Sequence, residues 1–114
     1  MKRGEIWLIS LDPKVGAEIQ KTRPAVIVND DALGLLPLRV IVPITDWKDR
    51  YAAAVWMVRL DPDAQNRLSK SSAADCFQIR SVSQQRFVKR IGEVGAVEMT
   101  EIGDALIRLL KIDV

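Results

Sequence analysis

The sequence predicts a mainly β fold with a C-terminal helix, in which several short strands form a small, strongly bent sheet or barrel. Short apolar and β-branched runs, separated by segments rich in Pro, Gly and charge, recur from residue 5 to residue 94. From about Glu98 the spacing of apolar residues changes to that of one helix face. Strands followed by a single helix indicate a curved sheet with the helix packed against it.

The first part of the chain contains four predicted strands. Pro24 is tolerated at the start of the second strand, and Pro43 is expected to end the third. The stretch 12–23 combines Pro, Gly and charged residues and is predicted to be a long loop. Asp30-Asp31 can cap a short helical turn that Pro37 ends. The predicted strands span residues 5–9, 25–28, 39–42 and 54–58.

The second part begins with a turn at 61–63 and a loop at 68–72. Residues 73–80 are predicted to form one strand, with Cys76 and Gln78 on the same face. A short helical turn is expected between Ser83 and Phe87, followed by a small strand at 91–94. The helix then presents one apolar face, formed by Met99, Ile102, Leu106, Leu109 and Leu110. One domain spanning residues 1–114 accounts for this pattern.

Composition limits the chemistry. Cys76 is the only cysteine, which excludes an internal disulfide and a multi-cysteine metal cluster. Histidine is absent, so the commonest zinc ligand and the commonest acid–base group near neutral pH are missing. We therefore expect no metal and no cofactor. No apolar run approaches the ~20 residues of a membrane helix, and no secretory core follows Met1, so a cytoplasmic protein is expected.

The distribution of charge is more informative than the net charge of +2. Residues 67–90 contain six basic residues and one acidic residue, whereas residues 91–114 contain two basic and five acidic residues. This asymmetry is compatible with a basic patch that faces phosphates and an acidic tail. A solvated charged surface explains the same counts equally well.

Four stretches of the sequence resemble the MazF/PemK family of toxin–antitoxin ribonucleases, in order and at similar spacing. The likeness extends from about residue 3 to residue 92. The four stretches are Arg3-Gly4-Glu5-Ile6-Trp7, Gly16-Ala17-Glu18 with Lys21-Thr22-Arg23-Pro24-Ala25-Val26-Ile27-Val28, Pro43-Ile44-Thr45, and Gln78-Ile79-Arg80-Ser81-Val82 leading to Arg86-Phe87.

This resemblance implies a small SH3-like barrel of the MazF/CcdB type and a homodimer. It also implies a sequence-specific, metal-independent endoribonuclease that cleaves single-stranded RNA as an mRNA interferase. The expected partner is a MazE-like antitoxin, which would be partly disordered and acidic and would fold onto the basic groove.

The resemblance also assigns roles to individual residues. Arg23 and Thr45 correspond to the catalytic pair of the family, and Glu18 matches an acidic position near the site. Four further residues are expected to contact RNA or to build its groove: Lys21, Trp47, Gln78 and Arg80. Trp47 follows Thr45 in a loop and could stack on a base, whereas Trp7, Trp56 and Cys76 are expected to be core residues.

Elementary chemistry agrees with the proposed pair. RNA can be cleaved without a metal by its own 2′-hydroxyl, which requires stabilisation of a crowded phosphorane. An Arg supplies a fixed fork of donors for the growing negative charge, and a Thr hydroxyl can donate to the same oxygens. Without histidine the general base stays open among Glu18, Asp46 and Asp75.

Two other functions compete with RNA cleavage. One is a non-enzymatic toxin that binds DNA gyrase, as CcdB does; resemblance to that family implies dependence on a Trp near the C-terminus, whereas this sequence ends Lys111-Ile112-Asp113-Val114. The other is an SH3-like binding module without activity, which the retained Arg23 and Thr45 argue against.

Overall fold

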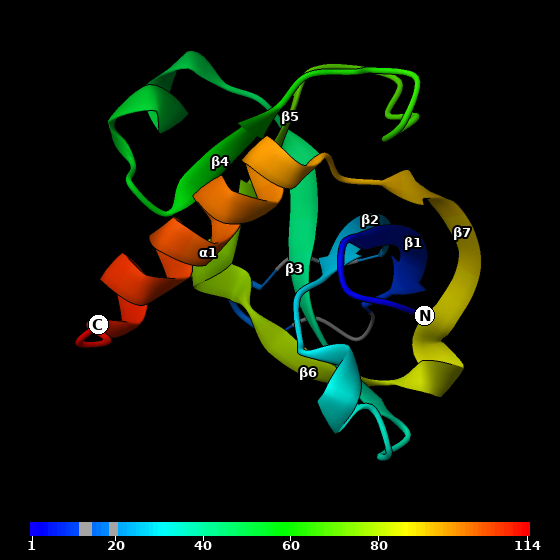
Figure 1. Ribbon diagram of the computed structural model, residues 1–114. Helices are drawn as coiled ribbons and strands as arrows, with labels where there is room; N and C mark the ends of the chain where they lie inside the picture. Colours follow the sequence, from blue (N-terminus) through cyan, green and yellow to red (C-terminus); the bar gives the residue numbers. More distant parts are fainter. Residues whose placement is uncertain (12–14, 19–20) are drawn as a thin grey trace.

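The protein is seen in a computed structural model that describes residues 1–11, 15–18 and 21–114. The described residues form strands, short 3-10 turns and one α-helix (Figure 1). The strands are β1 (Glu5–Ser10), β2 (Thr22–Ile27), β3 (Leu38–Asp46), β4 (Met57–Leu60), β5 (Ser72–Asp75), β6 (Arg80–Ser83) and β7 (Phe87–Glu93), and the helix is α1 (Ala96–Leu110). The 3-10 turns are η1 (Asp31–Leu33), η2 (Asp49–Ala53), η3 (Cys76–Gln78) and η4 (Gln84–Arg86).

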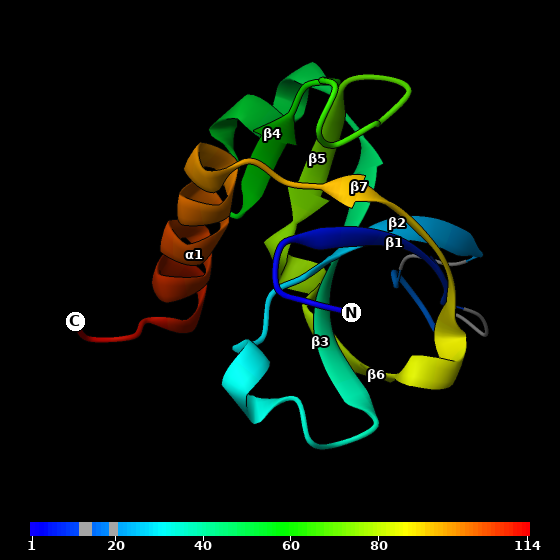
Figure 2. The same cartoon turned by 45° about the vertical axis from the view of Figure 1, so that its right-hand side comes forward.

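The strands form one strongly curved antiparallel sheet. Their order is β4-β5-β3-β2-β1-β7, and β6 pairs with the first half of β3. The sheet curls until β7 approaches β6, while α1 packs against β4 and η3 (Figure 2). No ladder in the described residues joins β7 to β6, so the sheet is barrel-like but open. The predicted mainly β fold with a C-terminal helix is confirmed.

Alternation along the strands divides the core into two clusters. In β2, Val26 packs into a cluster beneath α1, whereas its neighbours Ala25 and Ile27 pack into a second cluster inside the curl of the sheet. Ile102 and Ala105 are the fully or nearly fully buried residues of α1 and face the first cluster. Because β2 and β3 contribute to both clusters, these two central strands are held on both faces.

The prediction of one strand at residues 73–80 was wrong. The Asp75 carboxylate accepts a hydrogen bond of 3.1 Å from the Phe77 backbone N–H and so caps η3, which separates β5 from β6. Cys76 and Gln78 therefore lie in one tight turn and do not share a strand face. When an Asp side chain accepts a hydrogen bond from a nearby backbone N–H, that N–H is no longer available to a neighbouring strand. The alternation of apolar and polar residues in the sequence does not reveal this.

Other boundaries also differ from the predictions. Pro43 does not end its strand: it lies within β3, between residues 38–41, which pair with β6, and 44–46, which pair with β5. In that gap the missing N–H of proline interrupts neither the ladder with β6 nor the ladder with β5, while Pro43 stays opposite Ala25 in the ladder with β2. The strand predicted at 54–58 begins only at Met57, because a turn follows η2 in which the Met57 backbone N–H donates to the Ala54 carbonyl at 3.0 Å. The strand predicted at 91–94 begins earlier, at Phe87, as β7. The predicted turns near Asp30 and Ser83 are confirmed as η1 and η4, each capped by that side chain.

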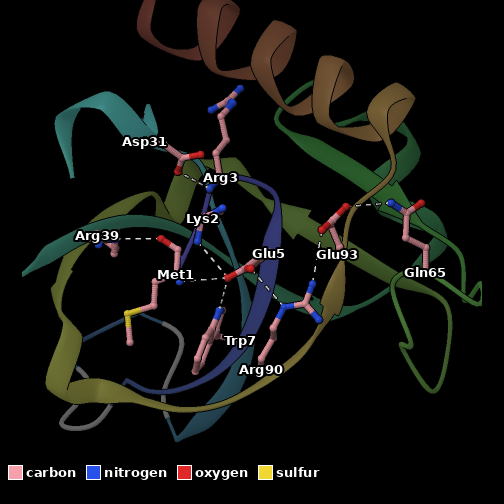
Figure 3. Close-up of polar contacts among 10 residues, drawn as sticks. All are labelled: Met1, Lys2, Arg3, Glu5, Trp7, Asp31, Arg39, Gln65, Arg90 and Glu93. Atoms are coloured by element: carbon pink, nitrogen blue, oxygen red, sulfur yellow. Dashed lines mark hydrogen bonds and ion pairs between the residues drawn. The ribbon is translucent and has the colours of Figure 1, made fainter.

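The first stretch of the family resemblance has a structural role. Glu5 is half-buried and accepts hydrogen bonds of 3.0 Å from Trp7 Nε1 and from the Lys2 backbone N–H (Figure 3). It also forms ion pairs with Arg90, at 3.2 Å, and with the amino group of Met1, at 3.3 Å. Partial burial raises the pKa of the carboxyl, but the hydrogen bonds from Trp7 and Lys2 and the contact with the charged amino group of Met1 outweigh it and lower the pKa to about 2. Glu5 thus connects β1 to β7.

The described helix is too short and too polar to cross a membrane.

Candidate active site

Arg23 and Thr45 lie on neighbouring strands. The ladder between β2 and β3 pairs Val26 with Val42 and Ala25 with Pro43. Arg23 lies two residues before Ala25 and Thr45 two residues after Pro43, so both lie just beyond the same end of this ladder. Both side chains are half-buried, and both line one hollow of about 290 Å³. The structure therefore brings the predicted pair together, although on two strands and not on two loops as the sequence indicated.

The hollow has walls from both central strands and from the loop between β4 and β5. Positive charge dominates it, since three cationic side chains and one carboxylate line it. The carboxylate of Asp46 forms an ion pair of 3.0 Å with Lys70 Nζ across the hollow. The lining consists of Thr22, Arg23, Pro24, Ile44, Thr45, Asp46, Arg67, Leu68, Ser69, Lys70, Ser72 and Ile91.

The two central side chains have unused donors. Within the described residues, neither the Arg23 guanidinium nor the Thr45 hydroxyl takes part in a hydrogen bond or ion pair. A half-buried guanidinium with five free N–H donors suits a planar or tetrahedral oxyanion such as a phosphate. The hydroxyl beside it can donate to the same anion. The arrangement can bind one phosphodiester at two points.

Glu18 lies outside this hollow. It occupies an exposed turn at residues 15–18, where its carboxylate accepts a hydrogen bond of 3.0 Å from the Val15 backbone N–H. Gln78 Nε2 donates to the Ala17 carbonyl at 3.1 Å, so η3 holds this turn. Lys21 is exposed just before β2 and has a backbone φ of 67°. Parts of the predicted loop, residues 12–14 and 19–20, lie outside the described residues.

The other two expected RNA contacts also lie elsewhere. Trp47 lines a separate hollow between η2, β4 and α1, where the Arg59 guanidinium stacks 4.9 Å from its ring centroid. Its indole Nε1 is buried without a partner among the described residues. Arg80 begins β6 and pairs with Ile41 of β3. Trp7 and Trp56 make edge-to-face contacts with Phe87 and Phe77, and Cys76 is fully buried, as expected of core residues.

The three carboxylates considered as the general base lie in different places. Asp46 lines the hollow beside Thr45, whereas Glu18 does not. Asp75 is buried and caps η3; burial raises its pKa, against the hydrogen bonds from the Phe77 and Gln78 backbone N–H groups. In the part of the chain that the structure describes, no three His, Cys, Asp or Glu side chains gather in one place. The groups available at the hollow are thus donors, cations and one carboxylate.

Arg67 and Lys70 line the hollow although neither was predicted to be a site residue. The charge asymmetry of residues 67–90 was the available signal, but it did not show which cations face Arg23. Their placement depends on the 61–70 loop, which meets β7 only in the folded chain: the Glu93 backbone N–H donates to the Gln65 carbonyl at 3.1 Å.

Comparison with known proteins relates this fold and site to one family. Residues 2–110 match the family described as PemK-like, MazF-like toxins of type II toxin–antitoxin systems. The chain is 34% identical over 113 residues to endoribonuclease MazF9 of Mycobacterium tuberculosis, covering 93% of this chain and 92% of that protein. It is 36% identical over 104 residues to endoribonuclease PemK of Escherichia coli, covering 90% of this chain and 76% of that protein.

Solved structures show the same fold. The crystal structure of MazF from Deinococcus radiodurans matches with a TM-score of 0.82 at 23% identity, over 98% of this chain and 97% of that chain. An endoribonuclease from a mycobacterial species, solved in complex with its cognate antitoxin, matches with a TM-score of 0.78 at 19% identity, over 100% and 98% of the two chains. By its sequence, this chain belongs to the family of PemK-like, MazF-like toxins of type II toxin–antitoxin systems.

Proposed function

We propose that this chain is the toxin of a toxin–antitoxin pair and a sequence-specific, metal-independent endoribonuclease that cleaves single-stranded RNA. Family membership and the endoribonuclease names of its relatives support the activity. The observation on which the residue assignment rests is the hollow that Arg23 and Thr45 share with free donors.

The proposed reaction uses the 2′-hydroxyl of the RNA as the nucleophile. The 2′-oxygen attacks the adjacent phosphorus, the bond from phosphorus to the 5′-oxygen breaks, and the products are a 2′,3′-cyclic phosphate and a 5′-hydroxyl. Arg23 binds the non-bridging oxygens, whose negative charge increases in the phosphorane. Thr45 donates to the same oxygens or orients the attacking group. Because β2 and β3 are packed on both faces, the backbone that carries these two donors is held in place before the substrate binds.

The two proton transfers need an acceptor and a donor. Asp46 is the carboxylate at the hollow, and we assign it the proton of the 2′-hydroxyl. The leaving 5′-oxygen takes a proton from water. Glu18, the alternative base, reaches the hollow only if the turn at 15–18 moves. Lys21, Gln78, Trp47 and Arg80 stay proposed RNA contacts, and their positions outside the hollow suit nucleotides further from the cleaved bond.

The proposed partners follow from the same family. Related MazF structures from Deinococcus radiodurans are complexes with MazE. We expect a MazE-like antitoxin segment, rich in acidic residues, to occupy the basic hollow and to exclude RNA. We also expect the protein to be a cytoplasmic homodimer. Light scattering measures the mass of the particle in solution and so tests the homodimer directly.

Product analysis tests the function. Purified protein is incubated with a mixed-sequence RNA in EDTA, and the new ends are mapped. We expect cuts at a short sequence motif, with 5′-hydroxyl and cyclic phosphate ends. A requirement for Mg²⁺, or 5′-phosphate ends, contradicts the mechanism. Intact RNA together with inhibited gyrase supercoiling favours the CcdB-like alternative, and RNA binding without any cleavage favours the inactive module.

A further inference from the structure

The loop between β4 and β5 forms the wall of the hollow that faces Arg23 and Thr45. We propose that this loop is a second phosphate subsite, in which Arg67 and Lys70 bind the RNA phosphate next to the cleaved one. The inference rests on the proposed function, because it takes RNA as the ligand. It adds two binding residues that neither the sequence motifs nor the catalytic pair contain.

The loop is built around one buried side chain, Asn66, which is 5% exposed. Asn66 Oδ1 accepts hydrogen bonds from the backbone N–H groups of Asp63, at 3.1 Å, and Leu68, at 3.0 Å. Asn66 Nδ2 donates to the Asp61 carbonyl at 2.8 Å. These bonds close the loop on both sides of Arg67. The loop is therefore held in one shape before any ligand arrives.

Contact with β7 fixes where this loop lies. A Cβ atom at Gly92 would stand 2.5 Å from the Asn66 carbonyl oxygen and 2.7 Å from the Gln65 carbonyl oxygen. Only a residue without a side chain permits this approach of two backbones. Arg67, the next residue, has a left-handed backbone with a φ of 55°. Its side chain is exposed to solvent and lines the hollow.

Both cations of the subsite are available to an incoming phosphate. The Arg67 guanidinium has no hydrogen-bond or ion-pair partner within the described residues. Lys70 does have one, Asp46, but their side chains are 64% and 51% exposed. An ion pair this open to water is weak. A phosphate that enters the hollow can therefore take Lys70 from Asp46, which frees the carboxylate beside Thr45.

The proposed subsite predicts how the salt dependence of RNA binding changes when one of its cations is removed. Each phosphate contact of a single-stranded nucleic acid contributes about 0.7 to the slope of log K against log salt concentration. The Arg67→Gln variant should lower the magnitude of that slope by about 0.7 and weaken binding roughly three- to tenfold at moderate salt. Lys89→Gln, which removes an exposed cation of β7 away from the hollow, is the matched control and should leave the slope unchanged.

The binding experiment uses a mixed-sequence RNA oligonucleotide carrying 2′-O-methyl groups, which cannot be cleaved, and fluorescence anisotropy from 50 to 300 mM salt. Lys70→Gln should behave as Arg67→Gln does. Asp46→Asn should bind the RNA more tightly than wild type, because Lys70 is no longer held, and yet should cleave more slowly. Circular dichroism confirms that each variant is folded.

A neutral methylphosphonate linkage then locates the subsite on RNA. Placed next to the cleaved bond, it should weaken binding to the wild type but not to Arg67→Gln. An unchanged salt slope in folded Arg67→Gln, or an undiminished methylphosphonate penalty in that variant, overturns the second subsite. Failure of the wild type to cut RNA refutes the proposed function instead, and the salt-slope comparison still decides whether Arg67 binds phosphate.

Discussion

Replacing Glu5 with Gln should lower the free energy of unfolding by about 1–2 kcal/mol at pH 7. Gln has nearly the same shape and can still accept from Trp7 Nε1, so the change removes mainly the negative charge. That charge faces Arg90 at 3.2 Å and the amino group of Met1 at 3.3 Å. The substitution therefore loosens the attachment of β1 to β7 without opening a cavity.

The magnitude follows from the pKa of Glu5. A carboxyl whose pKa falls from 4.5 to about 2 on folding gains at most about 3 kcal/mol at neutral pH. The Glu5 side chain is 15% exposed and Arg90 is 46% exposed, so water screens part of the attraction. Because the folded pKa is the lower one, this stabilisation is complete about one pH unit above 4.5 and is lost as the pH falls through 2.

Urea unfolding of both proteins between pH 7 and pH 3 measures this difference. We expect it to stay constant down to about pH 5.5 and to fall below half its value at pH 3. Glu101→Gln, on the exposed face of α1, is the control and should change stability by less than about 0.5 kcal/mol at any pH. A difference between wild type and Glu5→Gln that does not vary with pH would refute the linkage.

Three further predictions concern the site and the core. Gly92→Ala forces the backbones of β7 and the 61–70 loop apart and should destabilise the protein by about 1–3 kcal/mol in thermal melts; an unchanged Tm would show that this contact is not tight. Thr45→Val should slow RNA cleavage in single-turnover kinetics by on the order of 10²-fold, whereas Thr45→Ser should retain most of the rate, and equal rates would exclude the hydroxyl. Burial raises the pKa of Cys76 to about 12, so a thiol reagent at pH 8 should react only after unfolding; rapid labelling of the native protein would contradict this burial.

The sequence predicted correctly those elements that depend on residues close together in the chain. The helix was recognised because its apolar residues repeat along one face, and η1 because Asp30 is a strong capping residue. The strand break at Asp75 was missed because one side chain there takes a backbone N–H that a ladder would otherwise use. Alternating apolar residues look the same whether the strand continues or not.

The site was predictable only where a motif marked it. Arg23 and Thr45 came from the family resemblance, and the register of β2 and β3 then explains why two residues so far apart in sequence meet. Arg67 and Lys70 lay in a loop with no motif. Their position follows from the contact of Asn66 with Gly92, which joins distant parts of the chain and leaves no periodic signal in the sequence.

Cleavage by the Arg23→Ala variant tests the central claim most directly. A fluorescently labelled RNA containing the mapped cleavage motif is cut by excess protein in EDTA, so that the chemical step is observed. Removal of one preformed donor to the phosphorane should slow this step on the order of 10²–10³-fold, equivalent to about 3–4 kcal/mol of activation free energy, in a variant that remains folded. Cleavage by Arg23→Ala within a fewfold of the wild-type rate would contradict the assignment of this hollow as the active site.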